Sequence, residues 1–344
     1  MTDAQRAAEA PAPVPSSPRR RARRWTIHIL LLLAGLVLIG LAIRRVDPAA
    51  IAHDLNKLDA AAVALAFAAY VVAWGLRVWR LHYLAGAAGI PIPLAQAANT
   101  ALGANALNIV APARLGDVSA VVHLREVSGG KGPPAAATIL TWRLTDLGAL
   151  LTVALVAGLP LLALVPLRDG SGLAWTMAGG VAFLGLAAIA AKVARDERSS
   201  DLIDRLARRL FGSKAPMGAA FGHATALLFV PRVFLLGLLL AVGAWLADAV
   251  FAGIILHSLW PGNVLIVLVP VVLANAAKIL PTTPGGVGVY EVVFQVALQQ
   301  YGVDAATALT VGIATHLLLN AWTLVLGLPG AFAIGRSVSR SAVR

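Results

Sequence analysis

Apolar runs of roughly 18 or more residues recur along this chain of 344 residues, and they limit its fold more than any other feature. A helix of about 20 apolar residues spans the roughly 30 Å hydrocarbon core of a bilayer. The composition agrees, with 59% hydrophobic and 13% charged residues and a mean hydropathy of +0.81. The sequence therefore predicts an all-α polytopic membrane protein and excludes a water-soluble globular enzyme.

Charge and cysteine content narrow the function further. The chain has no Cys, which excludes disulfides, thiolate metal sites and cysteine nucleophiles. The 28 Lys and Arg against 16 Asp and Glu give a net charge of +12. Because the basic residues flank apolar runs and no nucleic-acid motif occurs, we expect them to orient the chain and meet anionic lipids rather than nucleic acid.

The first segment predicts a basic tail followed by a membrane span. Residues 1–24 are rich in Ala, Pro and Ser and end in five arginines, which is typical of a disordered cytoplasmic tail. The apolar run Trp25–Ile43 follows and ends in Arg44 and Arg45. A cleaved signal peptide is the alternative, but its apolar region would be shorter and followed by small residues, so we favour a retained span.

Seven further apolar segments follow. They lie at about 60 to 79, 94 to 111, 135 to 165, 173 to 193, 232 to 257, 263 to 280 and 306 to 334. Between the fifth and sixth of these eight candidates, residues 195–214 are strongly charged, with Leu and Ile at helical spacing. This pattern is typical of an amphipathic helix on the membrane surface, and it divides the chain into two halves.

The distribution of Lys and Arg selects a topology. Eight full spans would divide the 28 basic residues about evenly between the two sides of the membrane and would place 195–214 outside. If 94 to about 130 and 263 to about 303 each enter and leave on one side, most basic residues become cytoplasmic. We therefore predict about six full spans, two re-entrant helical hairpins and cytoplasmic termini in a bacterial inner membrane, with 336–344 as a second basic tail.

The two predicted hairpins share a sequence pattern. Ala-Asn-Ala at 104–106 leads to a proline at 112, and Ala-Asn-Ala at 274–276 leads to a proline at 281; Gly and an acidic residue then follow in both. Each copy lies between two predicted spans, and the two units run in opposite directions. The transmembrane domain, residues 25–335, is therefore predicted to contain an inverted repeat with halves at about 60–165 and 232–335.

Two charged pairs fall inside or beside the apolar segments of the first half. Arg143 and Asp146 lie three residues apart on one helix face, as a local ion pair or with the arginine facing a central cavity. Arg114 and Asp117 follow Pro112, where a helix must end or bend. Arg114 is a candidate phosphate ligand, and Asp117 is its partner or the cap of the next helix.

The stretch 280–291 is the most informative in the chain. It holds two prolines and three glycines, so it predicts an unwound segment at membrane depth whose exposed N–H groups favour an anion. Its acidic residue has three open roles: capping a helix, binding an ammonium group, or carrying a proton. A lysine upstream could neutralise it. The candidate substrate-binding residues here are Lys278, Pro284, Gly285, Gly286, Gly288 and Glu291.

Other residues within the apolar segments are assigned more simply. Asp248 has no cation nearby in sequence, which makes it a candidate for substrate binding or proton transfer; the alternative is an ion pair with another helix. Arg77 and Arg80 are interpreted as snorkelling anchors, and Trp74 and Trp322 as part of an interfacial aromatic belt. No metal-binding His spacing and no nucleotide-binding motif occur, so the sequence predicts no cofactor.

Three of these motifs together resemble the flippase-like transmembrane family typified by lysylphosphatidylglycerol synthetases. They are Pro112-x-Arg114-x-Gly116-Asp117, Arg143-x-x-Asp146, and Pro281-x-x-Pro284-Gly285-Gly286-x-Gly288-x-x-Glu291. The resemblance implies movement of a modified lipid between leaflets, with Arg114, Asp117, Arg143 and Glu291 at a central headgroup cavity. Two features depart from it: relatives often place an Arg in the final span, where this chain has His316 and Asn320, and no aminoacyl-transferase domain follows residue 335.

These inferences predict a non-enzymatic lipid translocator. Its expected partners are membrane lipids, whether anionic, aminoacylated, polyprenyl or hopanoid, with a separate lipid-modifying enzyme and a homo-oligomer as further possibilities. The alternative is an accessory subunit of a lipid, hopanoid or glycolipid biosynthesis system that transports nothing. A membrane-embedded transferase or hydrolase would rest only on the intramembrane carboxylates.

Overall fold

The structure is a computed structural model that describes residues 48–111, 114–164, 217–278 and 283–343, with a few isolated positions before them. Within these ranges it contains ten α-helices, two short 3-10 helices and no strand. The predicted all-α class is therefore confirmed for the described chain. Four predicted segments lie wholly or largely outside it: the tail 1–24, the span Trp25–Ile43, the span 173–193 and the helix 195–214.

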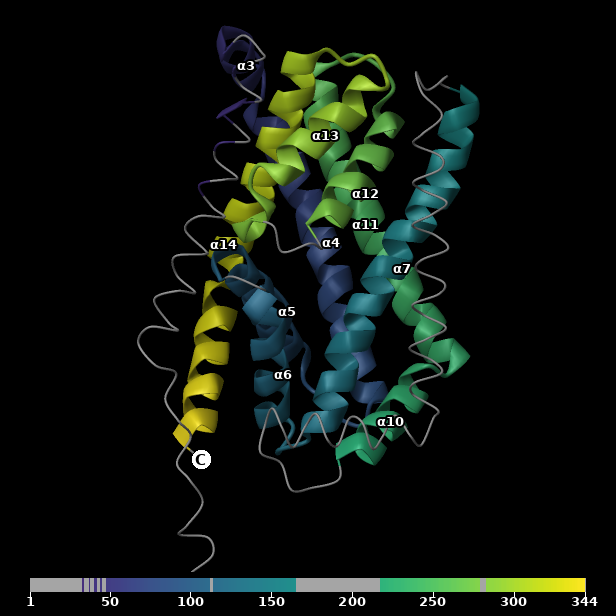
Figure 1. The fold of residues 1–344 in the computed structure, drawn as a ribbon, viewed down its shortest axis with the longest axis vertical. Coiled ribbons are helices and arrows are strands. Elements are labelled where there is room, and N and C mark those ends of the chain that lie inside the picture. The colour runs from purple at the N-terminus through teal and green to yellow at the C-terminus, as the bar shows by residue number, and fades with distance from the viewer. Residues whose placement is uncertain are drawn as a thin grey trace, which may run out of the picture.

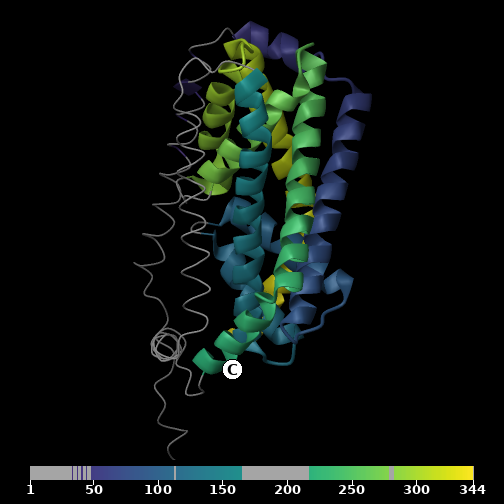
Figure 2. The same ribbon diagram turned by 90° about the vertical axis from the view of Figure 1, so that its right-hand side faces the viewer.

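Four long helices run along the length of the molecule (Figures 1 and 2). They are α4 (Ala60–Ala87), α7 (Gly132–Leu164), α11 (Pro231–Leu259) and α14 (Ala305–Val343). Each of the four contains a stretch long and apolar enough to cross a membrane. The protein is therefore a multi-pass membrane protein, and its long helices match four of the apolar segments that the sequence predicts.

Two pairs of shorter helices fill the space between the long ones. The first pair is α5 (Leu94–Val110) and α6 (Leu115–Val127); the second is α12 (Leu268–Ala277), preceded by the 3-10 turn η2 (Val264–Val267), and α13 (Val289–Gln299). At 1.5 Å per residue these α-helices are about 15 to 26 Å long. Each is therefore shorter than the roughly 30 Å hydrocarbon core.

The two helix pairs occupy opposite ends of the molecule, and their connecting segments meet near its middle. In Figure 1, α12 and α13 lie in the upper half and α5 and α6 in the lower half. The connection of the second pair contains the 3-10 turn η3 (Pro284–Gly286). Gly285 in this turn lies against Ile109 near the end of α5. The tips of both pairs thus come from opposite ends to one central region.

Two short helices and one extended helix differ from the predicted pattern. Neither α3 (Pro48–Leu55) nor α10 (Met217–Leu228) is among the segments predicted from the sequence. The last apolar segment was predicted to end at 334, with a tail after it, but α14 continues to Val343. Contacts with α6 explain the extension, because His123 Nδ1 lies 2.8 Å from Ser337 Oγ and Glu126 lies 3.9 Å from Arg340.

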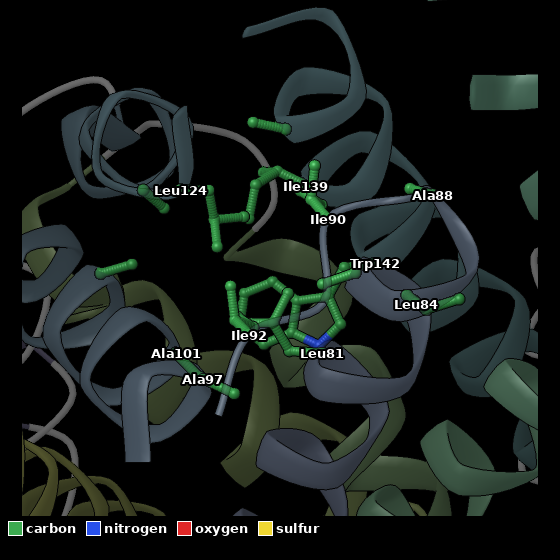
Figure 3. Close-up of a cluster of buried hydrophobic side chains, with 14 of the residues drawn as sticks. Leu81, Leu84, Ala88, Ile90, Ile92, Ala97, Ala101, Leu124, Ile139 and Trp142 are labelled. Carbon is green, nitrogen blue, oxygen red and sulfur yellow. The ribbon is translucent and has the colours of Figure 1, made fainter. Parts of the chain in front are cut away.

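The largest hydrophobic cluster joins α4, α5, α6 and α7. Figure 3 shows part of this cluster: Leu81 and Leu84 of α4, Trp142 of α7, Leu124 of α6, and Ile92 from the segment between α4 and α5. All five side chains are buried. This cluster fixes the first helix pair to the long helices, so the position of its tip is set by ordinary side-chain packing.

Small residues allow α5 and α14 to touch backbone to backbone. A Cβ atom added at Gly103 would overlap the backbone of Gly330, and one added at Gly327 would overlap the carbonyl oxygen of Leu102 and the Cβ of Ala106. Such close approach is typical of helix pairs in membranes, where van der Waals packing drives association and the hydrophobic effect does not. Glycine at these positions is therefore required by the crossing.

We expect Gly103→Ala to destabilise the protein, because the new methyl group must push α5 and α14 apart. Overpacking of this kind costs about 1–3 kcal/mol. The matched control is Gly75→Ala in α4, where an added Cβ would meet nothing within 4 Å. Thermal unfolding in detergent should show a lower midpoint for Gly103→Ala alone. An equal midpoint for both variants would contradict the close crossing.

Candidate functional site

A cavity of about 260 Å³, lined in part by charged side chains, lies where the two tips meet the long helices. Its wall takes residues from α4, α5, α7, α11, α12 and α14 and from both connecting segments. Four cations and two carboxylates line it: Arg77, Arg114, Arg143, Lys278, Asp146 and Asp248. Five of these six, all except Arg77, are candidate site residues from the sequence, and the fold brings together members of that set that lie up to 164 positions apart.

Asp248 has no cation nearby in sequence and pairs instead across helices, one of the two alternatives that its position left open. The Nη2 of Arg77 donates to Asp248 Oδ2 at 2.5 Å, and Nη1 lies 3.3 Å from Oδ1, so α4 and α11 are joined by a two-point ion pair. The guanidinium also lies over the rings of Trp74 and Trp245, at 5.4 and 5.0 Å from their centroids. Arg77 is therefore a buried cavity residue and not a snorkelling anchor, and Trp74 lines the cavity.

Arg80, the second predicted anchor, is also buried. Its side chain is completely inaccessible, and Nη2 donates to Asp146 Oδ1 at 2.6 Å. The interpretation of Arg80 as a snorkelling anchor was wrong for the same reason as that of Arg77. Each arginine lies on the face of α4 that packs against other helices and not on the face toward lipid.

Arg143 joins two carboxylates. It lies 3.4 Å from Asp146 on its own helix, as the three-residue spacing predicts. Its Nη2 and Nε also donate to Asp117 of α6, the latter at 3.1 Å. Because Asp146 is bound mainly by Arg80, the local pair is only one link in a network across α4, α6 and α7.

Arg114 stands at the tip of the first helix pair in an unusual backbone conformation. Its φ of 54° places it in the left-handed region, and no other non-glycine residue among those described has a positive φ. Its Nε lies 3.5 Å from Asp117, and 38% of its side chain remains exposed. Asp117 is therefore its partner and makes no N-cap bond to α6. Positions with such backbone strain are concentrated at binding sites.

Gly116 and Asn108 hold this tip together. A Cβ added at Gly116 would overlap the carbonyl oxygen of Ala104, so α5 and α6 approach too closely for any side chain there. Asn108 of α5 donates to Asp117 at 2.8 Å. The predicted break is confirmed, since α5 ends at Val110 and α6 begins at Leu115, whereas Pro112 itself lies outside the described residues.

The second tip is unwound, as the glycines predict. Gly285, Gly286 and Gly288 have φ values of 62°, 79° and 85°. Residues 279–282 lie outside the described chain, so nothing is added about Pro281. The aliphatic part of the Lys278 side chain lies directly on Gly286, where a Cβ would overlap it. Three left-handed residues in four positions explain why this motif requires glycine.

Glu291 and His316 form a buried pair beside this tip. Glu291 Oε1 lies 2.7 Å from His316 Nδ1, and its Oε2 accepts from the backbone N–H of Gly288 at 2.7 Å. The carboxylate therefore caps α13, one of the three predicted roles. Lys278 makes no ion pair with it within the described chain; instead its Nζ lies 4.6 Å from the Tyr290 ring centroid. The expected direct neutralisation is absent.

Sequence reasoning missed several contributors to the site. Arg77 and Arg80 have partners 171 and 66 residues away, so no local spacing reveals the pairs. His316 was noted only as a departure from relatives. Trp322, assigned to the interface, packs against Tyr70 and Phe251 inside the bundle at centroid distances of 5.3 and 5.8 Å.

Three polar atoms near the cavity have no partner among the described residues. They are Asn108 Oδ1, Trp245 Nε1 and Thr283 Oγ1, each on a residue that lines the cavity. They supply an acceptor, a donor and a hydroxyl that can do either. The surplus of cations over carboxylates in the lining gives the cavity the chemistry to bind a negatively charged group.

Comparison with known proteins identifies the family of this fold. A family model for the lysylphosphatidylglycerol synthase TM region matches residues 26–327. The chain belongs to this family. The match includes both helix pairs and every residue of the cavity wall. It thus confirms the resemblance that the sequence motifs suggested.

One curated relative adds a second point of comparison. It is named Glycosyltransferase AglD, comes from Haloferax volcanii and is 28% identical over 93% of this chain. The alignment covers 56% of the relative, so the chain corresponds to about half the length of that protein. No solved structure matches the chain.

We expect Asp248→Ala to destabilise the protein strongly, because Arg77 would remain buried without its carboxylate. Removing one partner of a buried pair costs about 3–5 kcal/mol. The double variant Arg77→Met with Asp248→Leu should recover most of this loss in a thermal unfolding assay.

The control for that experiment is Lys57→Met, which removes the cation of an ion pair at a position where the Lys57 side chain is 42% exposed. Its effect should stay below about 1 kcal/mol. If Asp248→Ala lowers the stability no more than Lys57→Met does, the Arg77–Asp248 pair is not desolvated.

Proposed function

We propose that this member of the lysylphosphatidylglycerol synthase TM family is a lipid translocator that moves a polar-headgroup lipid between leaflets without chemical change. The observation that carries the proposal is the charged cavity between the two helix-pair tips. Ionic side chains are expensive in a bilayer interior, so a cluster of them around a cavity marks a path for polar groups. The lipid tails would stay in the bilayer.

The charges of the cavity favour a negative headgroup. Four cations and two carboxylates line it, and Arg77 and Arg143 are already engaged by aspartates. Of the three arginines, Arg114 has the weakest ion pair: its contact with Asp117 is 3.5 Å long, and its side chain is partly exposed. Lys278 has no carboxylate partner within the described chain. These two residues, one from each tip, would bind a phosphate.

The same geometry supports the proposed topology. The short helices of each pair cannot cross the bilayer core singly, and the pairs approach from opposite ends (Figure 1). We propose that they are re-entrant hairpins of an inverted repeat, with six full spans around them. Arginine-rich ends favour cytoplasmic termini in a bacterial inner membrane.

The arrangement of the carboxylates supports a non-enzymatic role. Asp117, Asp146 and Asp248 each accept from an arginine, and Glu291 caps a helix. A general acid or base needs a carboxylate that can exchange a proton with the substrate, and a carboxylate held by arginine is a poor one. Structural charge pairing thus accounts for the aspartates without catalysis.

One finding favours a second candidate, an accessory unit of a glycolipid biosynthesis system. The relative from Haloferax volcanii carries the name of a glycosyltransferase, and this chain matches only about half of it. The chain would then bind a separate lipid-modifying enzyme and move nothing. Co-purification of such an enzyme, with no lipid movement by the purified chain, would support this candidate.

The translocator is tested in vesicles that contain acyl-labelled phosphatidylglycerol, phosphatidylcholine or lysylphosphatidylglycerol, with dithionite to bleach label in the outer leaflet. The wild-type protein should expose inner-leaflet phosphatidylglycerol fastest, because its headgroup is anionic. Arg114→Gln or Lys278→Gln should slow this by about tenfold or more, the equivalent of one charge-assisted hydrogen bond.

The matched control is Arg125→Gln, which removes an exposed arginine of α6 away from the cavity. It should behave as wild type. If the purified wild-type protein moves none of the three lipids, or moves all of them equally with and without Arg114 and Lys278, the translocator assignment is wrong.

A further inference from the structure

The His316–Glu291 pair carries a proton whose position follows from the geometry. His316 Nε2 lies 3.0 Å from the carbonyl oxygen of Gly285, and Nδ1 lies 2.7 Å from Glu291 Oε1. A carbonyl oxygen only accepts, so Nε2 must carry a hydrogen. The ring is almost fully buried, and α14 therefore holds both the unwound tip and the start of α13 through one side chain.

The second contact then requires one more proton. Either Nδ1 is also protonated and donates to a carboxylate, or Nδ1 is unprotonated and accepts from a protonated carboxyl group. Both arrangements place a single proton between Nδ1 and Oε1, and both leave the pair with no net charge. If that proton leaves, a lone pair on Nδ1 faces a carboxylate oxygen at 2.7 Å, and the pair carries one negative charge.

The surroundings show which group would respond to that charge. Tyr290 stacks on the His316 ring with centroids 4.3 Å apart, and Lys278 Nζ lies 4.6 Å from the same tyrosine ring. Lys278 is close enough to Asp248, Glu291 and His316 for their charges to interact. The remaining charged groups around this tip are the Arg77–Asp248 pair, which is internally neutralised, and Arg114 on the opposite tip.

Lys278 therefore has two alternative anionic partners. While the pair holds its proton, the lysine faces the cavity without a carboxylate and is available to a phosphate. When the proton leaves, Glu291 becomes an uncompensated anion, whereas Asp248 stays paired with Arg77, and the attraction of Glu291 draws Lys278 from the ligand. Proton and phosphate thus favour each other's binding, and the two effects must be reciprocal.

Building on the translocator proposed above, we infer that His316 and Glu291 form a proton-binding site linked through Lys278 to an anionic phosphate headgroup. The balance is simple: one proton from water converts the negative pair to the neutral pair, and one phosphate then replaces Glu291 as the counter-ion of Lys278. Release of the ligand returns the proton to water. Movement of the lipid would accordingly be driven by a proton gradient.

The test is calorimetric titration of the purified full chain in detergent with short-chain phosphatidylglycerol, in buffers of different ionisation enthalpy. The wild-type protein should take up as much as one proton per lipid as the pH rises through the titration of the pair. Above it, affinity should fall by about tenfold per pH unit. A second arm of the experiment uses glycerol phosphate in place of the lipid. If glycerol phosphate binds as tightly as the lipid, the assignment of a lipid as the ligand is wrong.

Two variants test the proton-binding pair and the lysine separately. Glu291→Gln still donates to Nδ1 and accepts from Gly288 but has no titratable proton, so it should bind the lipid tightly at all pH values with no proton uptake. Lys278→Met should bind weakly and without pH dependence. Glu126→Gln, the same change at a glutamate on α6 outside the cavity, should behave as wild type.

Proton uptake in Glu291→Gln equal to that of wild type, or none in wild type between about pH 5 and 9, would overturn the proposal. Failure of phosphatidylglycerol to bind would overturn its ligand assignment. Unfolding temperatures show whether each variant is folded. Because binding is measured without vesicles, an absence of lipid movement in the vesicle assay would reject the translocator and leave the linked proton site intact.

Discussion

The structure depends on the neutralisation of ionic side chains inside an apolar helix bundle. Arg77 binds Asp248, Arg80 binds Asp146, and Arg143 binds Asp117, and each pair joins two different helices. An unpaired charge at these positions would cost several kcal/mol in a bilayer, so helix positions that break a pair are strongly disfavoured. The pairs thus fix the register of α4, α6, α7 and α11, and they leave only Arg114 and Lys278 among the cavity cations without close, short ion pairs in the described chain.

Small residues bring the two helix-pair tips to this charged centre. Gly116 allows α6 to pass over the carbonyl oxygen of Ala104, and Gly286 gives space to the Lys278 side chain. The left-handed conformations of Arg114 and Gly285 turn the backbone at each tip. Backbone irregularity at membrane depth is stable only against protein or a water-filled cavity, because lipid offers no hydrogen bonds. Cavity and tips therefore require each other: the cavity solvates the irregular backbone, and the tips supply the cations.

Much of this arrangement is predictable from local sequence, and the rest is not, for a physical reason. Helix existence follows from apolar length, as α4 and α11 show, and the break before α13 follows from three glycines whose conformations other residues rarely adopt. Partners for Asp248 and Arg80 could not be predicted, because ion pairs between helices depend on which faces meet, and the sequence of one helix does not record that. Arg77 near the end of the apolar run 60 to 79 satisfies the sequence criteria for a snorkelling anchor and for a buried ligand equally well.

The residue at position 316 decides whether the contacts at the second tip depend on a proton. His316 lies between Gly285 and Glu291. An arginine could donate to the same carbonyl and carboxylate, but its charge would be permanent, and Glu291 would then be neutralised at every physiological pH. Histidine preserves both contacts and makes the second depend on a proton that water can supply or remove. An arginine at this position would hold the tip permanently, and Lys278 would always be released to the cavity. With histidine, the tip is held conditionally, and Lys278 is released to the cavity only when the proton is bound.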